Sequence, residues 1–245
     1  MSARRVVQGH DGPVEIDEAS RRVTKTYFDL RHDIAAAMAK REFNCGSRFF
    51  HVLSGFEHLA CPRMLACDLG APPRVVMEYC RGEPLSTYLL RIGERDSRAA
   101  DIAAKIHKGL RLYVEEFAEP YYDLSFQNLL YDEPTGILTF LDFGIPQRSP
   151  AAMTCSAPEA SLGILIGWAR YEMLRPSRLM CRRAGYTAVT QSLMAAFAGE
   201  VSREHVENMA RAAFDRLAAT GTTMRRSYYG VAGMLLGDRH PKPAA

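Results

Sequence analysis

The amino-acid sequence predicts an α+β fold in which a small sheet comes before a mostly helical second half. Apolar and polar residues alternate over the first 30 residues, which is typical of strands with one buried face. Beyond residue 150 the chain shows only helical patterns. Sheet and helices are therefore segregated along the chain, as in α+β proteins.

Length and composition narrow the class of protein further. The 245 residues are 47% apolar and 24% charged, which is typical of a globular chain with a sizeable core. The sequence has neither the run of about 18 apolar residues of a membrane span nor the start of a signal peptide. A net charge of +3 does not indicate a nucleic-acid partner. We therefore expect a cytoplasmic protein with no nucleic-acid and no membrane partner.

The N-terminal third predicts a hairpin, a helix and a buried strand. The hairpin has its strands near residues 14–16 and 23–27, where the residues at every second position are apolar except for Lys25. Helix-forming residues then run from Asp33, a plausible N-cap, to about Leu53. The short apolar run at residues 74–80 is typical of a buried strand.

The remaining two thirds predict helices around one further hairpin. The hairpin strands are expected at residues 128–131 and 137–141, on either side of a turn that contains Pro and Gly. Helices are expected at residues 86–92, 99–117, 159–174, 186–198 and 203–218, and residues 236–245 as a disordered tail.

The second hairpin carries the residues that indicate chemistry. Asp123 lies five residues before Asn128, where the first strand begins, and Asp142 follows the second strand and precedes Phe143 and Gly144. Their oxygens can converge on one cleft, and oxygen ligands of this kind suit a hard cation such as Mg²⁺ better than Zn²⁺. Alternatively, Asp123 and Asn128 only cap a loop and Asp142 only ends a strand.

These two motifs, D-x-x-x-x-N and D-F-G, resemble the catalytic loop and the D-F-G element of protein kinases and of aminoglycoside- and choline-type phosphotransferases. The resemblance implies a bilobal protein-kinase-like fold. Its small antiparallel-sheet N-lobe would comprise residues 1–80 and its mainly helical C-lobe residues 81–235. The resemblance also implies that Asp123 is the catalytic base and that Asn128 and Asp142 hold magnesium.

Five residues of the N-terminal third match further positions of the resemblance. Lys25 looks like the strand lysine that binds the ATP phosphates, and Glu42, seventeen residues later, looks like its ion-pair partner. Met77 would be the gatekeeper of a hinge in which the backbone of Glu78 and Cys80 binds adenine. Alternatively, the lysine and the glutamate are surface charges, and the hinge is only a buried connecting strand.

The expected function is an ATP- and Mg²⁺-dependent transfer of the γ-phosphate to a hydroxyl acceptor. The chain between Asp142 and Pro158 is short for a peptide-docking platform, so a small-molecule acceptor is favoured over a protein. Ala157-Pro158-Glu159 resembles the A-P-E element, which indicates a minimal atypical Ser/Thr kinase, such as an effector, as one alternative. Another is a nucleotide-binding pseudokinase scaffold. Tyr121 stands where the family commonly has His, and residues 9–12 supply only two glycines for the phosphate loop.

Overall fold

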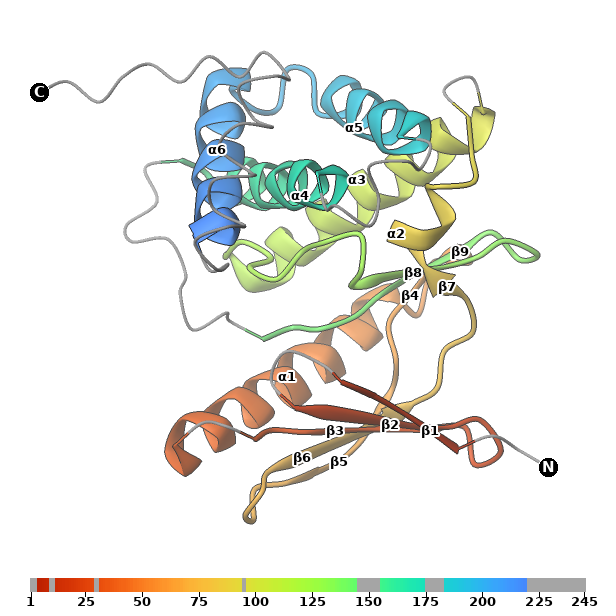
Figure 1. The fold of residues 1–245 in the computed structure, drawn as a ribbon, viewed down its shortest axis with the longest axis vertical. Helices are drawn as coiled ribbons and strands as arrows, with labels where there is room; N and C mark the ends of the chain where they lie inside the picture. Colours follow the sequence, from red (N-terminus) through yellow and green to blue (C-terminus); the bar gives the residue numbers. More distant parts are fainter. Residues whose placement is uncertain are drawn as a thin grey trace, which may run out of the picture.

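The computed structural model describes residues 4–8, 12–28, 31–93, 96–144, 155–174 and 183–219. These residues form six helices and two β-sheets, a mixed α+β arrangement as the segregated patterns predict. In Figure 1 the larger sheet lies at one end of the molecule and helices α3–α6 gather at the other, with α1 and the smaller sheet between them. The predicted disordered tail lies outside the described residues.

Sheet A, the larger sheet, has antiparallel strands in the order β1-β2-β3-β6-β5. The strands are β1 (Arg4–Gln8), β2 (Pro13–Asp17), β3 (Arg22–Thr26), β5 (Met64–Asp68) and β6 (Arg74–Glu78). The predicted first hairpin is β2–β3, in which Val14 pairs with Lys25 and Ile16 with Val23. Because side chains alternate across a strand, Lys25 shares its face with these apolar residues.

Helix α1 (His32–Leu53) packs against the face of sheet A that carries Lys25. Ala35 and Ala39 of the helix join Tyr27, Val75 and Met77 in one apolar cluster. The spacing of the two alanines is that of one helix face.

The start of α1 corrects the predicted cap. The helix begins one residue before Asp33, its N-cap is Arg31, and no side chain caps it. Asp33 instead lies in the first turn, where a negative charge still suits the helix dipole. Gly46 does not interrupt the helix, which is continuous from His32 to Leu53, and a Cβ at this position would lie 2.1 Å from the Met64 side chain of β5. The glycine lets α1 and β5 approach closely.

Sheet B has the strand order β4-β9-β8-β7. The strands are β4 (Leu59–Ala60), β7 (Glu83–Pro84), β8 (Leu129–Asp132) and β9 (Ile137–Phe140). The predicted second hairpin is therefore confirmed as β8–β9, with each boundary within one residue. Strand β4 runs parallel to β9, so the chain that leaves α1 is joined directly to this hairpin.

The remaining helices surround the largest apolar cluster. They are α2 (Leu85–Tyr88), α3 (Ser97–Phe117), α4 (Ala157–Met173), α5 (Ala184–Ala196) and α6 (Arg203–Ala219). Helix α2 is shorter than the predicted helix at residues 86–92, whereas the other predicted helices are present with boundaries within about two residues.

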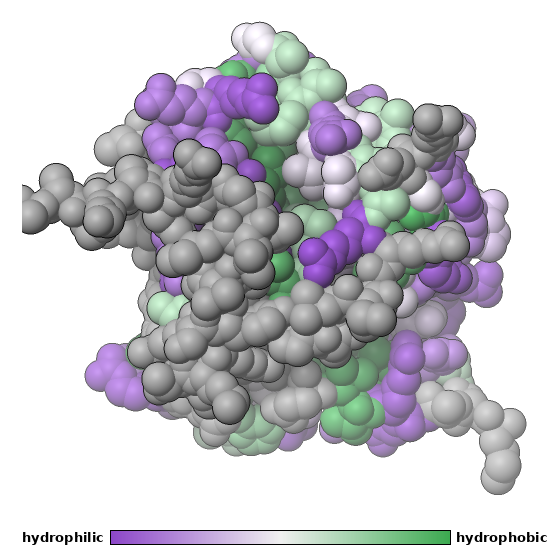
Figure 2. Space-filling model, turned by 45° about the horizontal axis from the view of Figure 1, so that its top comes forward, coloured by the Kyte–Doolittle hydropathy of each residue, from purple (hydrophilic) through white to green (hydrophobic). Residues whose placement is uncertain are grey.

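None of the described helices has both the length and the apolar character that a membrane crossing requires. On the face seen in Figure 2, the described residues include both hydrophilic ones and patches of hydrophobic ones.

Candidate active site

Three of the charged residues singled out in the sequence meet in the structure. The ammonium nitrogen of Lys25 lies 2.9 Å from Glu42 Oε2 and 2.9 Å from Asp142 Oδ1. The lysine is on β3, the glutamate on α1, and the aspartate directly follows β9. Lys25 is 7% exposed and Glu42 is 1% exposed, so neither is a surface charge.

The electrostatics of this centre favour a charged lysine. Burial opposes the ammonium form, but the attraction of Asp142 and Glu42 outweighs burial and raises the pKa of Lys25 well above its usual value. Burial raises the pKa of Glu42, which Lys25 partly offsets. At neutral pH the centre is a cation held between two acidic groups.

Tyr27 is a member of this centre that sequence reasoning missed. Its hydroxyl donates to Glu42 Oε2, the oxygen that also accepts from Lys25. Burial raises the pKa of Tyr27, so the phenol stays a neutral donor. The available signal was position: Tyr27 lies two residues after Lys25 and therefore on the same face of the chain.

Asn128 connects the loop that contains Asp123 to the chain that precedes Asp142. Its side-chain amide donates to the backbone carbonyl of Asp123 at 2.8 Å. The backbone carbonyl of Asn128 accepts from the N–H of Leu141 at 2.9 Å, which continues the β8–β9 pairing by one step. The structure thus brings Asp123, Asn128 and the start of the D-F-G motif onto one hydrogen-bonded unit.

Asp142 has an unusual backbone conformation. Its φ of 65° lies in the left-handed region, which non-glycine residues seldom adopt, although Asp tolerates it better than most. Such a conformation persists when its neighbours hold it in place. The carbonyl of Leu141 accepts the Tyr121 hydroxyl at 2.6 Å, and the Phe143 side chain is buried. These contacts on either side direct the Asp142 carboxylate toward Lys25.

Tyr121 itself is held by aromatic packing. Its ring stacks on Tyr113 at 4.5 Å between centroids and on Phe143 at 5.5 Å, with interplanar angles of 15° and 19°. The ring is buried, and its hydroxyl bonds the residue before Asp142. Tyr121 therefore braces the segment Asp142-Phe143-Gly144 from the side of the Asp123 loop.

The expected hinge residues occupy the end of β6 and the chain after it. Met77 is buried on the face of sheet A that also carries the lysine, in the apolar cluster beneath α1. Glu78 donates its backbone N–H to the Arg63 carbonyl, and its carboxylate pairs with Arg21 at 3.3 Å. Cys80 is half-buried, and burial raises the pKa of its thiol to about 11, so it is not a thiolate at neutral pH.

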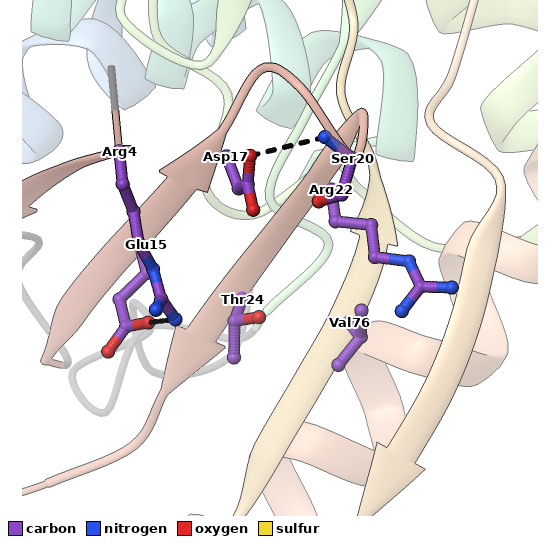
Figure 3. Close-up of a pocket in the computed structure, with 7 residues that line it drawn as sticks. All are labelled: Arg4, Glu15, Asp17, Ser20, Arg22, Thr24 and Val76. Atoms are coloured by element: carbon purple, nitrogen blue, oxygen red, sulfur yellow. Dashed lines mark hydrogen bonds and ion pairs between the residues drawn. The ribbon is translucent and has the colours of Figure 1, made fainter. Parts of the chain in front are cut away.

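A polar hollow lies on the opposite face of sheet A (Figure 3). It is lined by Arg4, Glu15, Asp17, Ser20, Arg22, Thr24 and Val76. Because Thr24 and Lys25 are consecutive residues of one strand, their side chains point to opposite faces. The hollow is therefore separate from the Lys25 centre.

The donor set of Asn128 and Asp142 fits magnesium in a nucleotide complex. Within the ranges that the structure describes, no three or more His, Cys, Asp and Glu side chains are arranged to hold a metal ion. Mg²⁺ at phosphate-binding sites takes one or two protein carboxylates and completes its shell with phosphate and water oxygens. Asn128 and Asp142 supply hard oxygen donors at the ends of neighbouring strands, and the Asp142 side chain is 24% exposed.

Two further sequence motifs were singled out, the glycines at residues 9–12 and Ala157-Pro158-Glu159. Residues 9–11 of the proposed phosphate loop lie outside the described residues. Glu159, of the A-P-E-like motif, forms a capping box with Ser156 at the start of α4 and accepts the backbone N–H of Ser202 at 2.8 Å. Although burial disfavours its charge, the hydrogen bonds from Ser202 and Ser156 lower the pKa of Glu159 to about 2. Glu159 thus joins α4 to the start of α6.

Comparison with known proteins adds no relative from which a role could be transferred. No protein-family model matches the chain, and a search of curated proteins finds no significant match.

Proposed function

We propose that the protein is an ATP- and Mg²⁺-dependent phosphotransferase with a bilobal protein-kinase-like fold, and that it transfers the γ-phosphate to a hydroxyl acceptor. The contact of Lys25 with Glu42 and Asp142 carries this proposal. Removing three charged groups from water is costly, and buried clusters with perturbed pKa values are enriched at functional sites. A lysine held between two carboxylates is suited to an anionic ligand accompanied by a cation.

The residues take the following roles in this proposal. Lys25 donates to phosphate oxygens, and Glu42, which also accepts the Tyr27 hydroxyl, keeps the ammonium oriented. Asn128 and Asp142 provide oxygen ligands for magnesium, which when bound neutralises charge on the transferred group. The adenine ring would lie beside Met77, with the backbone of Glu78 and Cys80 at its edge, as the resemblance implies.

Asp123 serves the acceptor rather than the nucleotide. Its carboxylate orients the attacking hydroxyl and accepts its proton as the new oxygen–phosphorus bond forms. The bond between the γ-phosphorus and the bridging oxygen breaks in the same transfer, and ADP leaves. The half-buried Asp123 lies in the loop that Asn128 ties down, which would keep its carboxylate in place.

A small hydroxylated molecule is the favoured acceptor. Helix α4 begins at Ala157, only fifteen residues after Asp142, and the intervening chain contains Pro146 and Pro150. A peptide-binding kinase needs a longer segment that can be ordered into a docking platform. Phosphorylation of a protein at a defined Ser or Thr, with no small-molecule acceptor, would identify the protein as a protein kinase instead.

The deciding experiment measures nucleotide binding and turnover in turn. We expect Mg-ATP at 100 times its Kd to stabilise the wild type by about 2.7 kcal/mol, as read from thermal unfolding. Asp142→Asn and Asn128→Ala should abolish the magnesium-dependent part of this stabilisation, whereas Asp101→Asn on the surface of α3 should retain it. Asp123→Asn should retain nucleotide binding and lose phosphate transfer to a panel of hydroxyl acceptors.

The possible outcomes separate the candidate functions. Wild-type protein that gains no stability from Mg-ATP would contradict the proposal. Full nucleotide binding without transfer to any acceptor would identify a nucleotide-binding scaffold instead.

A further inference from the structure

Two arginines of α1 reach the C-terminal end of α3. Arg48 donates from Nε to Glu116 Oε1 at 2.8 Å and from Nη2 to the same oxygen at 2.5 Å. Its guanidinium carbon also lies 4.7 Å from the centre of the Phe117 ring. About two turns earlier on α1, Arg41 forms an ion pair with Glu119. Helix α1 is therefore joined to α3 and to the residues just after it by two ion pairs and one cation–π contact.

The end of α3 is a suitable anchor for cations. The last carbonyls of a helix lack intrahelical partners and carry the negative end of the helix dipole. Arg48 Nη2 donates to the backbone carbonyl of Glu116 at 3.2 Å and so satisfies one of these groups. The acidic side chains of Glu116 and Glu119 add to the negative charge at the same end.

The anchored face of α1 differs from the face that carries Glu42. Arg41 and Arg48 are seven residues apart, which places them on one side of the helix, about two turns apart. Glu42 is the next residue after Arg41, but a rotation of about 100° per residue directs it toward sheet A and Lys25. Because the helix is continuous from His32 to Leu53, anchoring one face also fixes the position of the other.

The anchor also connects to the Asp123 loop. Glu119 lies two residues before Tyr121, whose hydroxyl bonds the carbonyl that precedes Asp142. Glu119 further accepts the Tyr113 hydroxyl at 3.4 Å, and Tyr113 stacks on Tyr121. The same short segment therefore touches α1 on one side and braces Asp142 on the other.

We propose that Arg41 with Glu119, supported by Arg48 with Glu116, positions Glu42 against Lys25 and so keeps the nucleotide site assembled before any ligand binds. These four are positioning residues, which act on the nucleotide only through Glu42. The inference rests on the proposed function, because the position of Glu42 matters for ATP only if Lys25 binds its phosphates. It also goes beyond that function, since it predicts a helix α1 that needs no separate activating step.

The test is a double-mutant cycle on the Kd for Mg-ATP. Glu119→Gln should raise this Kd by about three- to tenfold, the size expected when one partly buried ion pair is lost. In a Glu42→Gln background the same change should have almost no further effect on the Kd, because Glu119 acts on the nucleotide only through the position of the Glu42 carboxylate. The reversed pair, Arg41→Glu with Glu119→Arg, should bring the Kd back toward the wild-type value.

Glu207→Gln is the matched control. Glu207 on α6 accepts two hydrogen bonds from Arg170 of α4, at 2.6 and 2.9 Å, and both side chains are about as exposed as those of Arg41 and Glu119. This variant also breaks an ion pair between helices, but it should leave the Kd unchanged. An equal loss of affinity in Glu207→Gln would overturn the proposal. So would a double variant, Glu119→Gln with Glu42→Gln, in which the increase in Kd equals the product of the increases in the two single variants.

A second measurement separates failure of this inference from failure of the proposed function. Amide hydrogen exchange in the nucleotide-free protein should become faster along α1 in Glu119→Gln, but not in Glu207→Gln. If the wild type does not bind Mg-ATP, the proposed function fails and this exchange measurement alone decides the role of the ion pairs. Unchanged exchange along α1 in Glu119→Gln would show that they do not hold the helix.

Discussion

At the scale of single residues, the buried Lys25 ammonium controls the charge state of its surroundings. Glu42 lies in an otherwise apolar stripe of α1, and burial raises its pKa above the usual 4.5. The lysine makes an ionised glutamate tolerable there, since a buried carboxylate without a counter-charge is strongly destabilising. Removing the lysine should therefore change how stability depends on pH.

We expect Lys25→Met to be about 3–5 kcal/mol less stable than the wild type at pH 8, and to lose much less near pH 5. A carboxyl group whose folded pKa is raised contributes stability below its unfolded pKa and loses it as the pH rises through the folded value. The wild type should show a smaller loss, because the Lys25 ammonium, whose own pKa is raised above 10.5, partly offsets the effect of burial on the pKa of Glu42. Urea unfolding of both proteins at pH 5 and pH 8 measures the difference.

Lys40→Met is the control for this comparison. Lys40 is an exposed residue of the same helix, so its loss removes one positive charge without affecting the buried centre. The interpretation would be wrong if the stability of Lys40→Met and Lys25→Met changed with pH in the same way.

The hydroxyl of Tyr121 is a second group whose contribution can be isolated. Tyr121→Phe keeps the stacking on Tyr113 and Phe143 but leaves the Leu141 carbonyl without this donor. We expect a loss of about 1–2 kcal/mol in the free energy of unfolding, the usual cost of one buried hydrogen bond. If the proposed function holds, the rate of phosphate transfer should also fall under conditions in which the variant is fully folded, because Asp142 is held less firmly. An unchanged turnover in a destabilised variant would limit the hydroxyl to a structural role.

At the scale of secondary-structure elements, α4 owes its central position to two glycines. A Cβ on Gly163 would lie 2.5 Å from the Cβ of Met209, and one on Gly167 would lie 2.6 Å from the carbonyl oxygen of Ala210. Both obstacles belong to α6. The spacing of four residues places the glycines on one face, so the two helices approach closely along this line.

Gly163→Ala should therefore force α4 and α6 apart. We expect a destabilisation of about 1–3 kcal/mol, typical of an overpacked core, despite the higher helix propensity of alanine. Gly55→Ala, where a Cβ would meet nothing within 4 Å, should stay close to wild-type stability. Equal thermal midpoints for the two variants would contradict the close approach of the helices.

Some element boundaries followed from local patterns and others did not. The β8–β9 hairpin and helices α3–α6 were predicted, because turn residues and helical periodicity are local signals. Strands β1 and β5 were missed, since they form the two edges of sheet A and are largely exposed, which weakens their alternation. The Asp33 cap was wrong because the helix gains one further residue at its start.

At the scale of the whole molecule, contacts that are remote in the sequence assemble the site. Lys25 and Asp142 are 117 residues apart, yet their side chains form an ion pair. Helix α1 contributes Glu42 to this centre, while β4, just after it, pairs with β9, which leads into Asp142 (Figure 1). The larger sheet, α1 and the second hairpin are therefore tied together at the candidate site.

The sequence by itself determined the segregated α+β organisation and the identity of the charged site residues. Local patterns placed Lys25 on a strand, Glu42 on a helix, and Asn128 and Asp142 at hairpin ends, whereas the resemblance to kinases singled these residues out. Only the tertiary structure decided that Tyr27 shares the Glu42 carboxylate, that Tyr121 braces Asp142, and that Arg41 and Arg48 anchor α1 to α3. The physical reason is that these contacts join segments whose separation in space depends on how sheets and helices pack, and packing leaves no periodic signal in the sequence.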